Sequence, residues 1–128
     1  MAKCVLDASA LLALLNDEPG SEVVLKNLAH AVISSVNFTE VLSKLLDQNM
    51  PYAIAKELLG NLNLDIIDFD YEQSLGSALL RTKSKAHGLS LADRVCLNLA
   101  QKLALPALTA DKAWGKLNAP HLKVVVIH

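Results

Sequence analysis

Near its N-terminus the chain reads Lys3-Cys4-Val5-Leu6-Asp7-Ala8-Ser9-Ala10-Leu11-Leu12-Ala13-Leu14-Leu15. Residues 3–6 indicate a short buried strand, and the leucines after Asp7 recur at the spacing of a helix over residues 7–16. Asp7 is therefore expected where a strand ends and a helix begins. Three later acids are expected in similar positions, each in the first turn of a helix that follows an apolar segment: Glu40, Asp93 and Asp111. This repeated placement is the main functional signal in the sequence.

Short apolar segments and helical patterns alternate along the rest of the chain. Further strands are expected at residues 31–34, 64–69, 106–110 and 123–127. Further helices are expected at residues 21–29, from 37 onward, at 51–59, at 71–86, at 90–103 and at 111–117. Ser21 is expected to cap the helix at 21–29, while Asn37 and Ser90 are each followed three residues later by an acid, as in a capping box. The alternation predicts an α/β fold with an open, mainly parallel sheet covered on both faces.

Length and composition limit the class of protein. The 128 residues, 52% hydrophobic and 20% charged, are typical of an ordered globular chain, and we expect one domain over residues 1–128. The longest purely apolar run, Ala10 to Leu15, is far shorter than the roughly 20 residues that cross a bilayer. Because the N-terminus also lacks a secretory signal pattern, we expect a cytoplasmic protein with no membrane span. Cys4 and Cys96 lack metal-ligand spacing and are expected to be reduced core residues.

The four acids are expected to converge on one edge of the sheet. Right-handed crossovers bring strand-to-helix loops to the carboxyl edge of a parallel sheet, where ligands usually bind. Asp7 and Asp111 should share this edge, and Glu40 and Asp93 reach it if their helices begin there. Each acid taken alone is explained better by helix capping than by a site. Their joint placement, with Ser9 two residues after the first acid, favours a site.

Four carboxylates held together repel one another, so a cation is their natural counter-charge. Oxygen ligands without Cys or His at metal-ligand spacing favour Mg²⁺ or Mn²⁺ over zinc. Carboxylates that hold such ions can hydrolyse phosphodiesters, because one ion lowers the pKa of a water and a second stabilises the leaving oxygen. The sequence leaves open whether one ion or two are bound. The net charge of −1 argues against a protein that coats nucleic acid by positive charge, but it leaves a metal-dependent nuclease open.

Four segments together carry a family resemblance: Val5–Leu15, Ser35–Val41, Gly88–Leu97 and Leu108–Trp114. In order and spacing they closely resemble the PIN-domain ribonucleases, specifically the VapC-type toxins of prokaryotic toxin–antitoxin pairs. The resemblance implies a three-layer α/β/α PIN fold with a mainly parallel central sheet. It also implies Mg²⁺- or Mn²⁺-dependent endoribonuclease activity on RNA, homodimerisation, and inhibition by a cognate VapB-type antitoxin.

The resemblance further implies roles for individual residues. The metal-binding and catalytic acids are matched by Asp7, Glu40, Asp93 and Asp111. Ser9 and Thr109 match supporting hydroxyls, and Asn37 matches a polar neighbour of the second acid. Some PIN proteins have another acid two residues after the last one, where this chain has Ala113. This departure weakens the expectation that a second ion binds tightly before RNA arrives.

Other basic and aromatic residues are weaker candidates. Arg94 and Lys112 adjoin acids of the quartet and are expected to contact RNA phosphates, although salt bridges to those acids explain them equally well. A solvated helix face is the better interpretation of the strip formed by Arg81, Lys83, Lys85 and His87. Trp114 is expected to anchor a short helix in the core rather than to stack on a base. No histidine has paired spacing, and none is given a catalytic role.

Three alternatives remain open. A phosphoacceptor domain on a flavodoxin-like sheet usually has a pair of acids at the end of its first strand, whereas Leu6 precedes Asp7 here. A haloacid-dehalogenase-type phosphatase needs a second Asp two residues after the first, where this chain has Ser9. A PIN fold retained only for partner binding would bind metal and cleave nothing.

Overall fold

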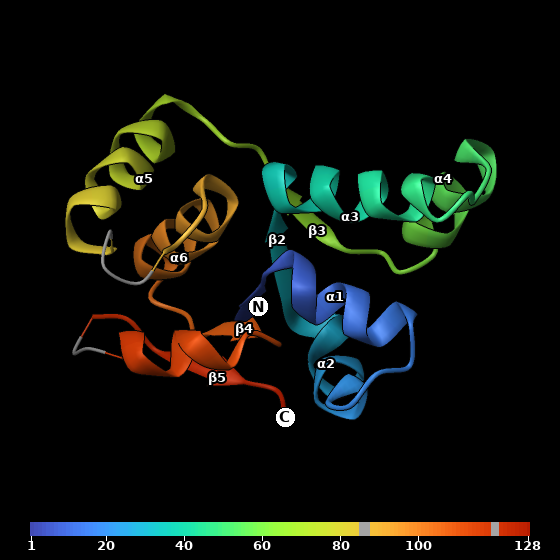
Figure 1. The fold of residues 1–128 in the computed structure, drawn as a ribbon, viewed down its shortest axis with the longest axis horizontal. Coiled ribbons are helices and arrows are strands. Elements are labelled where there is room, and N and C mark those ends of the chain that lie inside the picture. The colour runs from blue at the N-terminus through green and yellow to red at the C-terminus, as the bar shows by residue number, and fades with distance from the viewer. Residues whose placement is uncertain (85–87, 119–120) are drawn as a thin grey trace.

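The computed structural model describes residues 1–84, 88–118 and 121–128, and its centre is a sheet of parallel strands (Figure 1). The strands are β1 (Cys4–Leu6), β2 (Ala31–Ser34), β3 (Asp65–Ile67), β4 (Ala107–Thr109) and β5 (Val124–Val126). They form a five-stranded sheet in the order β3-β2-β1-β4-β5, and the pairing is parallel throughout these strands. The predicted parallel sheet is confirmed.

The strand order places a topological switch beside β1. The chain passes from β1 to β2 and β3 on one side and then returns to β4 and β5 on the other. Val5 is paired with Val32 of β2 and with Ala107 of β4. Because loops diverge in opposite directions where the strand order reverses, the carboxyl ends of β1 and β4 border a natural crevice.

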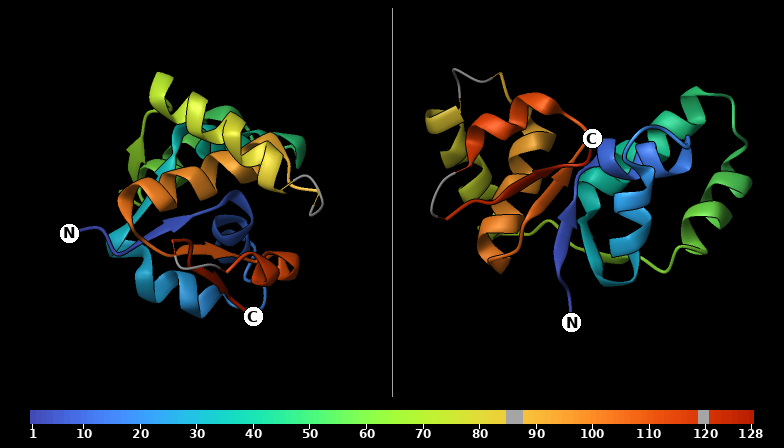
Figure 2. Two further views of the ribbon diagram at one scale, coloured as in Figure 1. Left: turned by 90° about the vertical axis from the view of Figure 1, so that its left-hand side faces the viewer. Right: turned by 90° about the horizontal axis from the view of Figure 1, so that it is seen from below.

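The helices lie on both faces of the sheet, as a three-layer α/β/α fold requires. Their bounds are α1 (Ala8–Leu15), α2 (Ser21–Asn27), α3 (Ser35–Asp47), α4 (Tyr52–Gly60), α5 (Tyr71–Ser84) and α6 (Leu91–Leu103), with short 3₁₀ turns η1 (Leu28–His30) and η3 (Lys112–Leu117). Helices α1 to α4 group on one side of the molecule, and α5, α6 and η3 group on the other (Figures 1 and 2). No helix in the described ranges is long and apolar enough to span a membrane.

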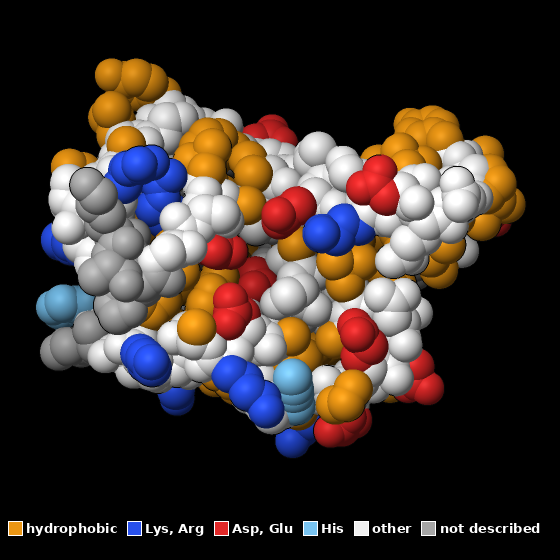
Figure 3. Space-filling model, in the orientation of Figure 1, with side chains coloured by type: hydrophobic (Ala, Val, Ile, Leu, Met, Phe, Trp, Pro, Cys, Tyr) orange, Lys and Arg blue, Asp and Glu red, His pale blue; other side chains and the backbone are white. Residues whose placement is uncertain are grey.

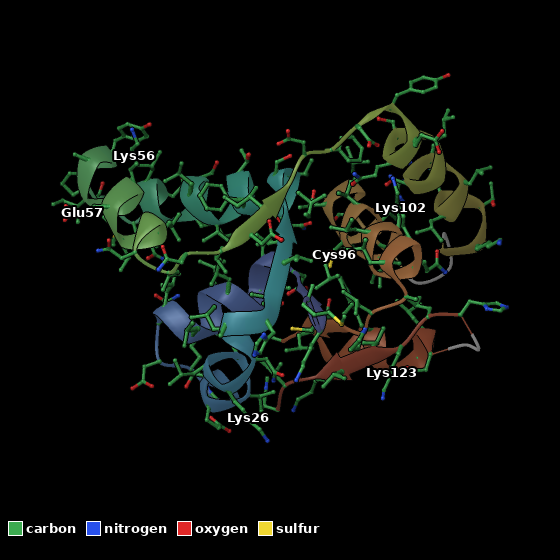
Figure 4. All side chains as sticks on the ribbon, turned by 180° about the vertical axis from the view of Figure 1, so that it is seen from behind. Lys26, Lys56, Glu57, Cys96, Lys102 and Lys123 are labelled. Carbon is green, nitrogen blue, oxygen red and sulfur yellow. The ribbon has the colours of Figure 1, made fainter. Side chains whose placement is uncertain are left out.

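Alternation along the strands produces two hydrophobic clusters. Cys4 and Leu6 of β1 pack with α1 to α4, whereas Val5 between them packs with α6 and η3. Trp114 is completely buried in the second cluster, which confirms its predicted role as a core anchor. Cys96 lies between α6 and the sheet (Figure 4), and both cysteines are free and buried, as predicted.

Two helix starts differ from the prediction. Helix α3 begins at Ser35 instead of Asn37, because the buried Ser34 ends β2 and its hydroxyl accepts a hydrogen bond from the Val36 N–H at 3.2 Å. Gly20, not Ser21, is the N-cap of α2, with φ +94°. A Cβ on Gly20 would meet the carbonyl oxygen of Ile127 at 2.7 Å, so both the backbone angle and the close approach require glycine.

Strand β3 is shorter than predicted, and the predicted end of helix α5 falls on residues that the structure does not describe. Strand β3 covers only Asp65–Ile67 of the predicted 64–69, because the chain then leaves the sheet and the Phe69 N–H donates to Ser35 Oγ at 3.1 Å. Helix α5 follows the prediction from Tyr71 to Ser84, and the rest of the predicted 71–86 helix lies outside the described residues.

Candidate active site

Asp7 occupies the position that the sequence predicts, directly after β1 and at the N-cap of α1. Its backbone is extended, with φ −88° and ψ 173°, and its carboxylate accepts a hydrogen bond from the Ala10 N–H at 2.8 Å. The residue is only 4% exposed. The apolar strand before it and the helix after it thus hold a charged group at the carboxyl edge of the sheet.

Two hydroxyls bind the Asp7 carboxylate and connect it to β4. Thr109 Oγ1, at the end of β4, donates to Asp7 Oδ2 at 2.6 Å. Ser9 Oγ lies 2.8 Å from Asp7 Oδ1 and accepts a hydrogen bond from the Ala110 N–H at 2.9 Å. The ends of β1 and β4, adjacent in the sheet but about a hundred residues apart in sequence, are thereby fixed around one carboxylate. Ser9 and Thr109 thus both bind Asp7, and the contact with metal, water or phosphate that the family resemblance implies for them stays a prediction.

Burial makes ionised Asp7 unfavourable. It raises the pKa of Asp7 from 3.8 to about 6, and the charge of Asp93 adds to the increase. The hydrogen bonds from Thr109, Ala10 and Ser9 lower the pKa but do not offset the burial. A cation beside this carboxylate would remove the penalty.

Glu40 and Asp93 approach Asp7 from two other helices. Asp93 closes the predicted capping box of α6, because its Oδ2 accepts from the Ser90 N–H at 3.0 Å and its own N–H donates to Ser90 Oγ at 3.2 Å. Glu40 was expected in the first turn of its helix but is the sixth residue of α3, since α3 begins at Ser35. Burial and then the charge of Asp93 raise the pKa of Glu40, while Lys44 and Asn37 lower it.

The buried thiol of Cys96 responds to the same acids. Its pKa is raised well above the ordinary value, first by burial and then by the charges of Asp7, Asp93 and Glu40. The charges of all three carboxylates therefore act on the Cys96 thiol in the same direction as its burial.

Asn37 joins the helices that carry Glu40 and Asp93. Its side chain is 1% exposed, and its Nδ2 donates to the Ala92 carbonyl at 3.1 Å. Because a carbonyl can only accept, this contact fixes which end of the amide faces α6. Within the described part of the chain, the buried Asn37 Oδ1 has no hydrogen-bond partner.

Asp111 completes the quartet from the start of η3. Its carboxylate caps η3 by accepting from the Ala113 N–H at 2.9 Å, and its own N–H donates to Thr109 Oγ1 at 3.0 Å. Asp111 is exposed, in contrast to Asp7. Thr109 thus contacts the first and the last acid at once.

All four acids line one cleft of about 140 Å³. Its complete lining is Asp7, Ala8, Ser9, Leu12, Asn37, Glu40, Lys44, Asp93 and Asp111. Figure 3 shows acidic side chains gathered in the middle of this face, between α1, α3, α6 and η3. Lys44 is the charged lining residue that the sequence interpretation missed, although its position four residues after Glu40 places it on the same helical face.

The lining fits a hard cation without being a ready-made metal cage. Among the described residues, no three His, Cys, Asp or Glu side chains are grouped closely enough to hold an ion by themselves. The donors are nevertheless all oxygens, two of the carboxylates have raised pKa values, and the buried Asn37 Oδ1 is unpartnered within the described ranges. This chemistry suits Mg²⁺ or Mn²⁺.

The comparison with family models decides the classification. The model described as "PIN domain" matches residues 4–119. The chain belongs to the PIN domain family. A search of curated proteins gave no significant match.

Solved structures share this PIN fold at low sequence identity. A toxin–antitoxin complex from Klebsiella pneumoniae has a TM-score of 0.76 and 22% identity, covering 98% of this chain and 98% of that chain. DNA-bound VapBC from Salmonella typhimurium has a TM-score of 0.74 and 17% identity, again covering 98% of both chains. VapBC2 from Rickettsia felis, bound to a promoter DNA fragment, has a TM-score of 0.73 and 19% identity, covering 95% of this chain and 96% of that chain.

One predicted RNA contact of this PIN domain lies away from the cleft. Arg94 is 7% exposed, and its Nη1 donates to the Ser77 carbonyl of α5 at 3.0 Å. The phosphate contact and the salt bridge predicted for Arg94 are therefore both wrong, because α5 covers the side of α6 on which Arg94 lies. Lys112 is exposed at the start of η3, outside the cleft lining, and its contact with RNA stays a prediction.

The predicted basic strip is only partly visible. Arg81 and Lys83 are exposed on α5, while Lys85 and His87 lie outside the described residues. Neither Arg81 nor Lys83 belongs to the cleft lining.

Proposed function

We propose that this PIN domain is a Mg²⁺- or Mn²⁺-dependent endoribonuclease that acts as a VapC-type toxin in the cytoplasm. The supporting observation is that the nearly fully buried Asp7 shares one cleft with three other carboxylates. A stabilising role alone does not account for a carboxylate whose pKa burial raises to about 6. Perturbed carboxylates in a cleft are typical of catalytic and metal-binding sites.

In this proposal, Asp7, Glu40, Asp93 and Asp111 hold the cation. When bound, the ion lowers the pKa of a water and neutralises charge on the phosphate. Hydrolysis of the RNA would form one bond from the water oxygen to phosphorus and break one P–O ester bond, while the water loses one proton and the leaving ribose oxygen gains one.

The protein's own part is to orient the acids before RNA arrives. Ser9 and Thr109 hold the Asp7 carboxylate from two sides. Asn37 fixes α3, and hence Glu40, against the start of α6 beside Asp93. Asp111 is held through the hydrogen bond from its N–H to Thr109. Loss of a supporting contact of this kind typically lowers metal affinity or activity by about 10- to 100-fold.

An apolar groove supports the proposal of an antitoxin partner. A cavity of about 480 Å³ between α3, α4 and β3 is lined by apolar side chains that include Phe38, Leu42 and Ile66. Tyr52 and Ile54 on α4 are 58% and 54% exposed. We propose that an antitoxin segment occupies this groove. Co-purification with the product of an adjacent gene, lost in Leu42→Asp, would support it, and unchanged co-purification would contradict it.

A second apolar surface supports the proposed homodimer. Tyr71, Leu75 and Leu79 recur every four residues on α5 and are 75%, 50% and 66% exposed. A stripe of this kind is typical of a protein contact. Light scattering should give a dimer for the parent chain and a monomer for the double substitution Leu75→Asp with Leu79→Asp; a parent monomer would contradict the dimer.

The test of the proposed function is to sequence the 5′ ends of cellular RNA after brief induction of the parent chain and of Asp7→Ala. Cuts present only with the parent are expected, and they would also name the RNA. Identical patterns in a folded Asp7→Ala variant would contradict the assignment. No new cuts with either chain would favour a PIN fold retained for partner binding.

A further inference from the structure

The acidic cleft presents a problem for an RNA substrate, because phosphates and carboxylates repel. Four acids line the cleft, and a bound divalent cation neutralises only part of their charge. Some positive group of the protein is needed where the RNA backbone enters. Arg94, which the sequence suggested for this task, is buried under α5.

Among the residues that the structure describes, Lys44 is the one basic residue in the lining of the cleft. It lies on α3 one helical turn beyond Glu40, so both side chains face the same side of the helix. Lys44 is exposed, and its charge lowers the pKa of Glu40, which places the ammonium within electrostatic reach of the acids. The exposed ammonium therefore lies at the edge of the cleft that the four acids line.

Lys44 is also not committed to an ion pair. The salt bridge found among the described residues joins Lys102 and Asp70 at 3.9 Å, on the α5–α6 side of the molecule. Lys44 forms no salt bridge with any carboxylate of the described residues. A lysine with a long, flexible stem and no fixed partner is free to bind a phosphate oxygen that comes close to the cleft.

We propose that Lys44 binds a phosphate of the RNA at the α3 side of the cleft. The proposal rests on the endoribonuclease function proposed above and adds a substrate-positioning residue to it. Lys44 offsets the repulsion between the acids and the RNA backbone, and it places the chain so that a neighbouring phosphate lies over the acid quartet. Its contribution is to binding, not to the chemical step.

The test compares Lys44→Ala with a matched control, Lys26→Ala. Lys26 is an exposed lysine near the end of α2 that projects away from the body of the protein (Figure 4), and its substitution removes the same charge outside the cleft. A fluorescein-labelled single-stranded RNA is titrated with each chain in Ca²⁺ at several salt concentrations, and gels confirm that the RNA stays intact. Cleavage rates in Mn²⁺ and calorimetric Mn²⁺ titrations without RNA accompany the binding curves.

Lys44→Ala should weaken RNA binding by about tenfold and reduce the slope of log affinity against log salt by about 0.7, as expected for one lost phosphate contact on a single strand. In the cleavage assay KM should rise with kcat nearly unchanged. Lys44→Arg should recover most of the affinity, and Lys26→Ala should match the parent. Mn²⁺ affinity should not fall in Lys44→Ala, because removal of a cation weakens no metal ligand.

The outcomes separate this proposal from the proposed function. Parental RNA affinity and salt slope in Lys44→Ala, with cleavage intact, would overturn the role of Lys44 alone. A change only in Mn²⁺ affinity would assign Lys44 to balancing Glu40 and would also overturn it. If the parent binds RNA through Lys44 but cleaves nothing in Mn²⁺, the nuclease function fails and the phosphate contact stands. A parent that neither binds nor cleaves RNA overturns both.

Discussion

Asp93 and Arg94 are neighbours in the sequence at the start of α6, yet their side chains lie in two different polar regions. Asp93 lines the acidic cleft with Asp7, where hydroxyls and backbone N–H groups surround the buried carboxylate. Arg94 lies under α5, where one of its nitrogens binds the Ser77 carbonyl. Within the described residues, Arg94 Nε, Gln73 Oε1 and Ser77 Oγ are buried without a hydrogen-bond partner.

The difference lies in access. The acids surround an open cleft of about 140 Å³ in which a cation can neutralise them. The guanidinium is enclosed between two helices. A buried charge is costly without a counter-ion, so a region that can admit the counter-ion is suited to function, whereas an enclosed region is structural. Each region makes a separate prediction for its own charged residue.

The largest expected effect is on activity in the cleft. Asp7→Asn keeps the size and the helix cap but removes the charge, so RNA cleavage in Mn²⁺ should fall by more than about 100-fold. Stability without metal at pH 7.5 should be equal to that of the parent or higher, because the penalty of the buried charge is gone. Cleavage rates and urea unfolding of the same preparation check both points. Parental cleavage by the variant would remove Asp7 from the site.

Under α5 the expected effect is on stability. Arg94→Ala leaves a cavity and an unpaired Ser77 carbonyl, so the free energy of unfolding should fall by about 2–4 kcal/mol. Arg94→Met fills most of the space without a charge and should stay within about 1.5 kcal/mol of the parent. RNA affinity of the folded variants should be unchanged. Weaker RNA binding with parental stability would restore Arg94 as a phosphate contact.

A smaller expected effect is on the pH dependence of stability, which Asp7 in the cleft should change. The folded-state pKa of Asp7 is raised from 3.8 to about 6, so its stabilising contribution is complete below pH 3.8 and is lost as pH rises through about 6. Without metal, the parent should therefore lose up to about 3 kcal/mol relative to Asp7→Asn between pH 4 and 7. The raised pKa of Glu40 acts in the same direction in both proteins.

Urea unfolding of the two proteins across this pH range measures the difference directly. Saturating Mn²⁺ should abolish or reverse it, because the ion competes with the proton for Asp7. A constant difference between parent and variant from pH 4 to pH 7 would show that burial does not perturb Asp7.

The sequence predicted those parts of the fold and site that depend on local patterns. The end of β1 at Leu6, directly before Asp7, follows from hydrophobic periodicity, and the Ser90–Asp93 capping box follows from capping chemistry. Both are confirmed. The start of α3 was misplaced because Ser34 and Asn37 are both good caps. Only the tertiary structure shows that Ser34 caps the helix while the Asn37 amide binds Ala92.

The surroundings of Arg94 and Lys44 depend on distant elements and could not be predicted from local patterns. The position of Arg94 next to Asp93 suggested a place in the site, but its burial depends on how α5 packs on α6. The lining of the cleft by Lys44 depends on how α3 is placed relative to α1 and α6. The spacing of four residues predicts that Lys44 and Glu40 lie on the same face of the helix. It does not predict which other elements that face contacts.

The central claim is that the acid cleft holds a divalent cation through Asp7. Calorimetric titration of Mn²⁺ into metal-free parent and Asp7→Asn at pH 7.5, with and without single-stranded RNA, tests it most directly. The parent should bind Mn²⁺ saturably, and Asp7→Asn should bind it more than about 100-fold more weakly. A parent that binds no Mn²⁺ under either condition, or a folded Asp7→Asn that binds it equally well, would contradict the claim.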